Sequence, residues 1–377
     1  MSIPLYIPKE TREHEKRVAL VPSVAAKLQK LGLDISIEAG AGSAARIPDS
    51  AYTEAGVTLG SAEGKQLFFR VQPPTVEEVA QMPEGAVLCS FIYAQREPAV
   101  VKALQERKIT CFAMELIPRI TRAQAMDALS SQAALAGYYA ALLAATHLHR
   151  ILPMMTTAVG SLRPARILVM GAGVAGLQAL ATAKRLGAMI EGYDVRPEVK
   201  EQVQSVGGKF VDTGVNAVGE GGYARELTDE EKEQVDAVLT RHIQQADAVI
   251  TTASIPGKPS PKILSEAQIM GMKDGSVIID LAAEGGGNTP LTKPGETVEV
   301  GPATIVAPLN IASHLAEHAS ELYSRNLLSL VTLMIDEGEL KLDWEDEVLA
   351  KSVLTHDGDI RNAAAREAVE NQTQGAL

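Results

Sequence analysis

Short apolar runs alternate with amphipathic stretches along the chain, and the first third of the sequence shows this pattern most simply. Short strands are predicted at 3–8, 34–40, 86–94 and 110–116. Apolar residues at helical spacing predict helices at 23–32, where Gly32 suits the C-terminal cap, and at 98–108. Strands that alternate with helices in this way form a parallel sheet with helices on its faces. The first 120 residues therefore predict an α/β domain.

The alternation of strands and helices starts again after a long helical stretch at 122–150 and a connection rich in Pro, Gly and Thr at 151–166. Short apolar strands, as expected for strands buried on both faces, are predicted at 166–170, 189–194, 248–253, 276–282 and 304–309. Helices are predicted at 174–186 and from about residue 197. This second series predicts a second α/β domain.

The last long helix, predicted at about 312–337, begins after the second series of strands. We expect it to return to the first domain, which is then discontinuous. The predicted domains are an N-terminal α/β domain of 1–132 plus 311–377 and a second domain of 133–310. The tail beyond the last helix is charged and then polar, so it is expected to fray, with Trp344 as its anchor.

Composition and charge exclude several classes of protein. The formal net charge is −12, which repels nucleic-acid phosphates and disfavours docking on anionic lipid through a basic patch. The Ala-rich stretch 133–152 is read as a buried helix, because a membrane span needs about 20 strongly apolar residues. The N-terminal apolar run is too short for a signal peptide. Cys89 and Cys111 lack metal-ligand spacing and fit a reducing cytoplasm.

A dinucleotide-binding motif lies at the start of the second domain. Gly171, Gly173 and Gly176 form G-x-G-x-x-G directly after an apolar strand, at the opening of a helix that ends at Gly187. The first glycine allows the tight turn, the second lets a pyrophosphate approach the backbone, and the third lets helix and strand pack closely. The phosphates are then expected on free N–H groups at the helix N-terminus.

An acidic residue, Asp194, ends the next predicted strand, which completes the context that this motif requires. A carboxylate there accepts hydrogen bonds from ribose hydroxyls and repels a 2′-phosphate, so NAD(H) is favoured over NADP(H). Arg196 is the one residue nearby that suits a 2′-phosphate. Val174 and Val195, beside the glycine turn and beside Asp194, belong to the same predicted cofactor-binding set.

A polar stretch at 118–132, PRITRAQAMDALSSQ, follows a buried strand and is a candidate reaction-site loop. On a helix, Gln124, Asp127 and Ser130 share a face and could hydrogen-bond a carboxamide and a ribose while Arg119 meets phosphate. The alternative is a plain helix start, with Thr121 and Gln124 as a capping box.

Two further stretches have both a functional and a structural interpretation. The Gly-rich segment 212–235 carries a single aromatic residue, Tyr223, so it is either a lid over the nucleotide or a connector. The sequence His314-Leu-Ala-Glu317-His318 matches H-x-x-E-H, but without a third ligand it is read as a solvated helix face.

In combination these motifs resemble the NAD(H)-binding subunit of proton-translocating NAD(P) transhydrogenases. The resemblance covers nearly the whole chain, through IPKETREHEKRVALVP, ELIPRITRAQAMDALSSQAALAGY, ARILVMGAGVAGLQALATAKRLGA, GGYARE, IPGKPSPKIL, GSVIIDLAAEGGGN and RNLLSL. The most specific stretch is RITRAQAMD, since the corresponding loop of the family is named after its Arg, Gln and Asp, here Arg119, Gln124 and Asp127.

The resemblance implies two Rossmann-like parallel-sheet domains with a cleft between them, and NAD(H) on the second domain with its nicotinamide under that loop. It implies that Tyr223 lies on a mobile loop, that Gly222 lies beside the adenosine, and that Ser254 stands where a larger apolar residue is usual. It also implies a homodimer, a membrane domain that conducts protons, and an NADP(H)-binding domain that exchanges hydride directly. The subunit would be cytoplasmic and peripheral, on the inner face of a bacterial plasma membrane.

The alternatives are an alanine dehydrogenase, which shares the fold, and a non-catalytic NAD sensor. Arg17 matches the substrate-carboxylate arginine of alanine dehydrogenases. Gln72, however, stands where their catalytic lysine is expected, and Tyr93 stands where their histidine is expected. Without these, imine formation from pyruvate lacks its acid and base. A sensor needs no polar row such as the one at Gln124. We therefore expect no acid–base side chain, and hydride transfer only with an NADP(H)-binding partner.

Overall fold

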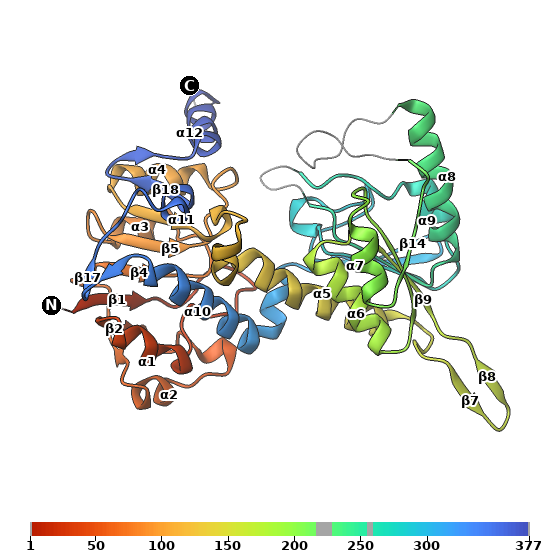
Figure 1. Ribbon diagram of the computed structural model, residues 1–377, viewed down its shortest axis with the longest axis horizontal. Coiled ribbons are helices and arrows are strands. Elements are labelled where there is room, and N and C mark those ends of the chain that lie inside the picture. The colour runs from red at the N-terminus through yellow and green to blue at the C-terminus, as the bar shows by residue number, and fades with distance from the viewer. Residues whose placement is uncertain (1, 216–227, 255–258, 376–377) are drawn as a thin grey trace. The chain divides into compact units, whose positions relative to one another are not determined.

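The computed structural model describes residues 2–215, 228–254 and 259–375. The chain divides into two compact units, unit 1 with Met1–Gln132 and Ser313–Leu377, and unit 2 with Ala133–Ala312 (Figure 1). It passes from unit 1 to unit 2 within helix α5 (Ala128–His147) and returns within the 3₁₀ helix η6 (Ile311–Leu315). None of the described helices is long and apolar enough to span a membrane.

Unit 1 is built on an eight-stranded sheet of the described residues, in the order β19-β18-β6-β5-β4-β1-β2-β3. The strands are β1 (Ile3–Ile7), β2 (Leu33–Ile37), β3 (Thr58–Leu59), β4 (Leu67–Phe69), β5 (Val87–Ser90), β6 (Thr110–Ala113), β18 (Val353–His356) and β19 (Asp359–Ile360). The six N-terminal strands pair in parallel, whereas β18 pairs antiparallel with β6 and with β19. Their order, 3-2-1-4-5-6, is that of a Rossmann sheet.

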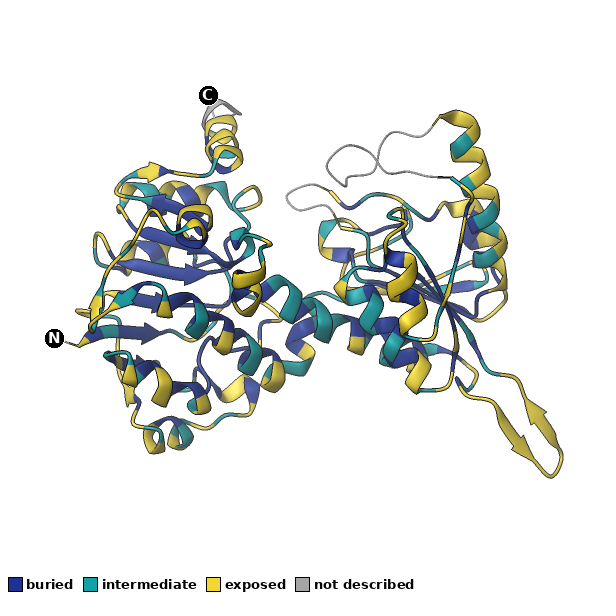
Figure 2. Ribbon diagram, viewed as in Figure 1, coloured by how far each residue is buried: buried dark blue, intermediate teal, exposed yellow. Residues whose placement is uncertain are grey.

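Helices cover both faces of this sheet. They are α1 (Pro22–Lys30), α2 (Asp49–Glu54), α3 (Val76–Gln81), α4 (Pro98–Glu106), α10 (Ala316–Thr332), α11 (Glu347–Ser352) and α12 (Ala363–Gly375), with 3₁₀ turns η1 (Ser43–Ala45), η2 (Met114–Leu116) and η3 (Thr121–Met126) and a small hairpin, β16 (Ile335–Asp336) and β17 (Glu339–Leu340). Helices α1, α10 and α11 contribute to the core on one face, and α3, α4 and α12 to the core on the other. Figure 2 shows the central strands as buried.

Unit 2 repeats this architecture with a seven-stranded sheet of the described residues, in the order β11-β10-β9-β12-β13-β15-β14. The strands are β9 (Arg166–Met170), β10 (Met189–Tyr193), β11 (Lys209–Phe210), β12 (Ala248–Thr251), β13 (Ser276–Asp280), β14 (Thr297–Val300) and β15 (Ala303–Val306). Only β14 pairs antiparallel among these. The parallel strands again have the Rossmann order. The order in which the chain adds strands reverses between β9 and β12, and such sheets bind ligands at this point.

Helices also cover both faces of the unit 2 sheet. They are α6 (Val174–Arg185), α7 (Val199–Ser205), α8 (Asp229–Gln245) and α9 (Glu266–Met270), with a 3₁₀ turn η5 (Ala283–Gly285). Ala and Leu side chains of α5 and α6 fill one core, and α8 and α9 fill the other. Helix α8 begins as its acidic first turn predicts, with Thr228 and Glu231 forming a capping box.

Two local predictions are wrong, and the predicted connection contains a hairpin that was not predicted. The stretch 122–150 is not one helix, because η3 ends at Met126 and α5 begins at Ala128. The connection 151–166 contains an exposed hairpin, β7 (Met155–Thr157) and β8 (Gly160–Leu162). The tail does not fray over its described part: it adds β18 to the sheet edge, where Thr355 and Val353 pair with β6. An open sheet edge offers unpaired backbone groups, and this pairing satisfies them.

The prediction for Trp344 is confirmed. Its ring lies stacked near Phe112 of β6, with ring centroids 6.2 Å apart, and 4.5 Å from the ring of His356. The tail is therefore anchored on the sheet by an aromatic contact as well as by strand pairing.

Candidate functional site

The glycine turn of unit 2 has the geometry that a pyrophosphate requires. Gly171 follows β9 with φ +96°, a conformation that favours glycine. A Cβ on Gly176 would overlap the carbonyl oxygen of Gly171, so this position needs glycine for helix and strand to pack. A Cβ on Gly173 would meet nothing within 4 Å. The open position is thus the one at which a ligand approaches the backbone, at the N-terminus of α6.

Asp194 lies at the carboxyl end of β10, adjacent to the turn. Its Oδ2 accepts a hydrogen bond from the amide of Ala172 at 2.8 Å, and its Oδ1 accepts one from the amide of Arg196 at 2.9 Å. Burial alone would raise the pKa of Asp194, but the hydrogen bonds from Arg196 and Ala172 outweigh it and hold the pKa below its usual value. Asp194 is therefore a carboxylate at neutral pH, as an acceptor of ribose hydroxyls must be.

Apolar and hydroxyl side chains surround this carboxyl edge. Val174 and Val195 are exposed, at 45% and 44%, and provide apolar surface beside the glycines and beside Asp194. Ser254 is exposed shortly after β12. Gly222 and Tyr223 lie outside the described residues. The predicted residues that the structure describes in unit 2 therefore follow the ends of β9, β10 and β12.

Sequence reasoning missed the polar residues that hold this edge in place. Thr252 donates from its hydroxyl to the carbonyl of Gly171 at 2.8 Å. Asp280, fully buried at the end of β13, accepts from Thr251 Oγ1 and from the amide of Asn288. Asn288 in turn bonds both backbone groups of Ala253. The signal for these residues was a buried strand that ends in Asp and is followed by GGGN.

These observations fit NAD(H) as the ligand of unit 2. An open backbone position at Gly173, first-turn amides of α6 that have no partner within the helix, and an ionised acceptor at Asp194 are the groups that hold a dinucleotide.

In unit 1, the polar row at 119–130 is presented by η3 and the start of α5. Arg119 and Gln124 are exposed. Asp127 caps α5, since its Oδ1 accepts from the amide of Ser130 at 2.9 Å and its Oδ2 accepts from the Ser130 hydroxyl at 2.6 Å. The capping box of Thr121 and Gln124 does not form, because no side chain caps η3. The amide of Gln124 is therefore not used as a cap.

Helix η3 is held from several sides. Arg122 makes a bidentate ion pair with Asp346, the N-cap of α11, at 2.8 Å for both bonds. Ala123 and Met126 are buried in the core of unit 1, together with Leu327 of α10. Gln124 thus projects from a short helix whose opposite side is fixed.

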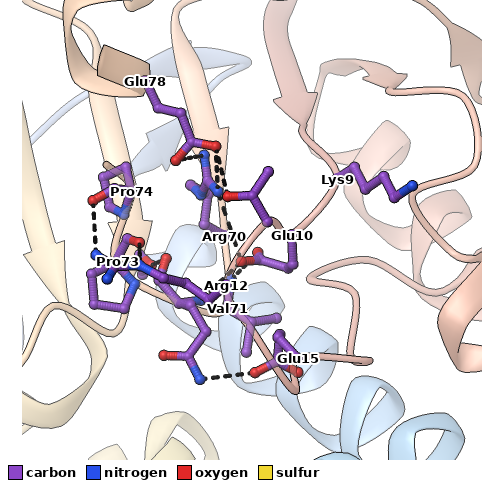
Figure 3. Close-up of polar contacts among 12 residues, drawn as sticks. Lys9, Glu10, Arg12, Glu15, Arg70, Val71, Pro73, Pro74 and Glu78 are labelled. Carbon is purple, nitrogen blue, oxygen red and sulfur yellow. Dashed lines mark hydrogen bonds and ion pairs between the residues drawn. The ribbon is translucent and has the colours of Figure 1, made fainter. Parts of the chain in front are cut away.

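A buried ion network lies where β1 and β4 of unit 1 end (Figure 3). Glu10 accepts from the amides of Val71 and Gln72, at 2.6 and 3.2 Å, and Arg70 lies 3.9 Å from Glu10 and 3.0 Å from Glu78. In unit 2 the corresponding edge carries the glycine turn. In unit 1 the carboxyl group of Glu10 accepts from the amides of Val71 and Gln72, and no G-x-G-x-x-G follows β1.

The same network contains the residues that bear on the alanine dehydrogenase alternative. Arg17 is 5% exposed and is engaged by Glu15 through Nε and Nη2, at 2.9 and 2.6 Å, and by Gln132 through Nη1 at 2.9 Å. Burial opposes the charge on Arg17, but the Glu15 carboxylate keeps the pKa of Arg17 above its usual value. Gln72 donates its amide to Glu15 at 2.8 Å. The side chains of Arg17, Glu15, Gln132 and Gln72 are therefore hydrogen-bonded to one another.

The zinc-peptidase pattern lies in η6 and the start of α10. His314, Glu317 and His318 are exposed, and no cluster of three or more His, Cys, Asp or Glu suited to a metal occurs among the described residues.

The fold and the glycine turn together define a protein with two Rossmann-type units, of which unit 2 has the features of a dinucleotide-binding domain. Family models give the particular family: the description "Alanine dehydrogenase/PNT, N-terminal domain" matches residues 6–136, and "Alanine dehydrogenase/PNT, C-terminal domain" matches residues 140–363. The chain belongs to the alanine dehydrogenase/PNT family, and NAD(H) is its cofactor.

Individual relatives agree with this assignment. The chain is 47% identical over 375 residues to an NAD(P) transhydrogenase subunit alpha of Rhodospirillum rubrum, covering 95% of this chain and 97% of the relative. The crystal structure of transhydrogenase from Sinorhizobium meliloti has a TM-score of 0.87 and 43% identity, covering 95% and 99% of the two chains. A structure of L-alanine dehydrogenase has a TM-score of 0.83 at 21% identity, covering 98% and 99%, and shows the shared fold.

Proposed function

We propose that this chain is the NAD(H)-binding subunit of a proton-translocating NAD(P) transhydrogenase. In this function hydride passes directly between NAD(H) on this chain and NADP(H) on a partner domain. Bound NADH supplies the hydride from its nicotinamide ring. The resemblance in the motifs and the identity to a transhydrogenase subunit support the proposal.

The residues of unit 2 are assigned to cofactor binding. Gly171, Gly173 and Gly176 form the turn that holds the pyrophosphate, and Asp194 accepts from the adenosine ribose. The other residues proposed for this set are Val174, Val195, Arg196, Gly222, Tyr223 and Ser254.

The residues of the 119–130 row are assigned to the nicotinamide end. Gln124, which the fold leaves exposed, orients the ring through its amide, with Arg119 and Ser130 as further contacts. Asp127 belongs to the same ring-orienting set as Gln124 and Arg119, and its hydrogen bonds to Ser130 also cap the start of α5. None of these side chains needs to move a proton, since hydride exchange between two nicotinamides releases none. The residues then act through alignment.

The observation that carries the proposal is the environment of Gln72. An amino-acid dehydrogenase needs an acid and a base at the reacting carbon. This chain has an amide at position 72, and that amide donates to Glu15 inside the network around Arg17. Such a group transfers no proton, which favours hydride exchange over imine chemistry.

The proposed assembly contains further subunits. We infer a homodimer of this chain, a membrane subunit that conducts protons and an NADP(H)-binding subunit. The site is then cytoplasmic, with the chain held peripherally at the inner face of a bacterial plasma membrane through its partners. No role with nucleic acid is proposed.

The test uses the purified chain with and without an NADP(H)-binding partner domain. The chain alone is expected to bind NADH and to catalyse neither transhydrogenation nor oxidation of NADH with pyruvate and ammonium. Addition of the partner should start hydride transfer in solution. Pyruvate-dependent oxidation of NADH by the chain alone would instead establish an alanine dehydrogenase. Binding without transfer in the presence of an active partner would favour the sensor.

A further inference from the structure

A buried side chain of α10, Asn326, is hydrogen-bonded to the backbone of η3. This residue is 6% exposed, and its Nδ2 donates to the carbonyl oxygen of Ala125 at 2.9 Å. Ala125 lies in the last turn of η3, one residue after Gln124. Carbonyl groups in the last turn of a helix lack partners within the helix, so an external donor there fixes where the helix ends.

The orientation of the Asn326 amide is determined by its two partners. A carbonyl oxygen only accepts, so the Nδ2 group must face Ala125. The Oδ1 atom then faces Ser131 of α5, whose hydroxyl donates to it at 2.8 Å. Asn326 therefore joins three elements, η3, α5 and α10, that are separated by up to 201 residues in the sequence.

The junction continues into the buried network of unit 1. Gln132 donates to the Ser131 hydroxyl at 3.3 Å and to the carbonyl of Ala319 at 3.1 Å, and its Oε1 accepts from Arg17. Arg17 is held by Glu15. The segment that presents Gln124 is thus tied through side-chain hydrogen bonds to the buried Arg17–Glu15 ion pair.

We propose that Asn326 is a positioning residue for hydride transfer: it sets the place and direction of η3 and so the alignment of Gln124. Asn326 touches no substrate in this role. The inference rests on the proposed function, since it assigns Gln124 to the nicotinamide. Proximity effects are steep, and a displacement of about 1 Å costs on the order of 100-fold in rate.

The test compares Asn326→Asp with Ser324→Ala in the full chain. Asn326→Asp keeps the shape of the side chain, and its carboxylate cannot donate to Ala125. Ser324 lies on the same helix, is 1% exposed and accepts from the amide of Val21 at 3.3 Å, so Ser324→Ala removes a buried hydrogen bond that does not reach η3. Three quantities are measured for each: NADH affinity, hydride transfer with the NADP(H)-binding partner domain, and amide hydrogen exchange over residues 121–127.

Asn326→Asp is expected to slow transfer by about 10- to 100-fold with an NADH dissociation constant within about twofold of the native value. The amides of Ala123 and Asp127, which bond within this segment, should exchange faster. Ser324→Ala should change none of the three. Ser131→Ala should act like a weaker Asn326→Asp, and Ser131→Thr, which keeps the hydroxyl, should restore transfer. If Asn326→Asp fails to fold, the comparison of Ser131→Ala with Ser131→Thr tests the proposal instead.

Native transfer in a variant with faster exchange at 121–127 would overturn the inference, because η3 would then not control alignment. Native exchange in Asn326→Asp would overturn it too, because Asn326 would not hold η3. Lack of transfer by the native chain with an active partner is a different result. It contradicts the proposed function, and this role of Asn326 with it, whereas the exchange data still report whether Asn326 holds η3.

Discussion

Asp194 and Arg196 form a bidentate pair at the carboxyl end of β10. Arg196 Nε lies 3.0 Å from Asp194 Oδ1, and Arg196 Nη2 lies 3.1 Å from Asp194 Oδ2. Arg196, the nearby side chain that would suit a 2′-phosphate, is therefore bound to Asp194, the carboxylate that would repel such a phosphate. The pair keeps Asp194 ionised and holds the guanidinium against it.

Asp194→Ala is expected to weaken NADH binding and to reduce discrimination against NADPH. Loss of a charged acceptor for ribose hydroxyls costs about 1.5–3 kcal/mol, which is roughly 10- to 100-fold in the dissociation constant of NADH. Arg196 is then released from its partner and can meet a 2′-phosphate. Equilibrium titrations with NADH and NADPH check this. Asp336→Ala, which removes an exposed carboxylate paired with Lys341 in unit 1, is the control and should leave both affinities unchanged.

Gly173→Ala should weaken NADH binding about tenfold or more while leaving stability nearly unchanged. The φ of Gly173 is −73°, and its Cβ would point into open space, so the free protein tolerates alanine. The methyl group then occupies the space that the pyrophosphate needs. Thermal unfolding and NADH titration of the same samples separate the two effects. Unchanged NADH affinity would place the pyrophosphate elsewhere.

Gly176→Ala, unlike Gly173→Ala, should act mainly on stability, with a loss of about 1–3 kcal/mol in the free energy of unfolding. Its Cβ would overlap the carbonyl oxygen of Gly171, so β9 and α6 must move apart. The free energy of unfolding in urea measures this loss. A fully stable Gly176→Ala variant would contradict the assigned packing role.

Gln124→Asn is expected to slow hydride transfer on the order of 100-fold and to change NADH affinity little. The shorter side chain withdraws the amide from the ring without affecting the glycine turn. Gln81→Asn, the same change at an exposed site of unit 1, should have no effect. Normal transfer with lost NADH binding would assign Gln124 to anchoring instead of alignment.

Glu10 should make the protein less stable as pH rises towards neutrality. Burial raises the pKa of Glu10 to about 7, although the charge of Arg70 and the amides of Val71 and Gln72 oppose the shift. The folded state therefore keeps a proton that the unfolded state has lost. The stabilisation is full below the unfolded pKa of 4.5 and is lost as pH rises through about 7.

Urea unfolding between about pH 5 and about pH 7.5 measures this effect. The native protein should lose stability over this range, and Glu10→Gln, which does not titrate, should show a flatter curve. Glu84→Gln is the control: Lys108 lowers the pKa of Glu84, so its stabilisation is lost only at lower pH. A slope in Glu10→Gln equal to the native slope would assign the titration to another group.

The two Rossmann-type sheets could be predicted because their signals are local. A parallel strand buried on both faces must be a short apolar run, and Ile3–Ile7 and Ser276–Asp280 are such runs. The glycine turn at 171–176 is equally local, since φ at Gly171 and the close packing at Gly176 each demand a glycine.

The edge strand β18 and the 3₁₀ helix η3 could not be predicted in the same way. The backbone of Val353–His356 is an edge strand because β6 leaves an unpaired edge, and this partner is more than 200 residues away in the chain. Residues 121–126 have a helical pattern, but the cap at Asp127 starts a new helix there.

The sequence by itself determined the two α/β units, the dinucleotide turn and the resemblance that led to Gln124, because each depends on residue types at short, fixed spacings. Only the tertiary structure decided which polar groups act together. Asn326 meets Ala125, Arg17 meets Gln132 and Thr252 meets Gly171 across long stretches of chain. A buried polar group must find a partner wherever the fold places one, so these partners are defined by distance in space and leave no periodic trace in the sequence.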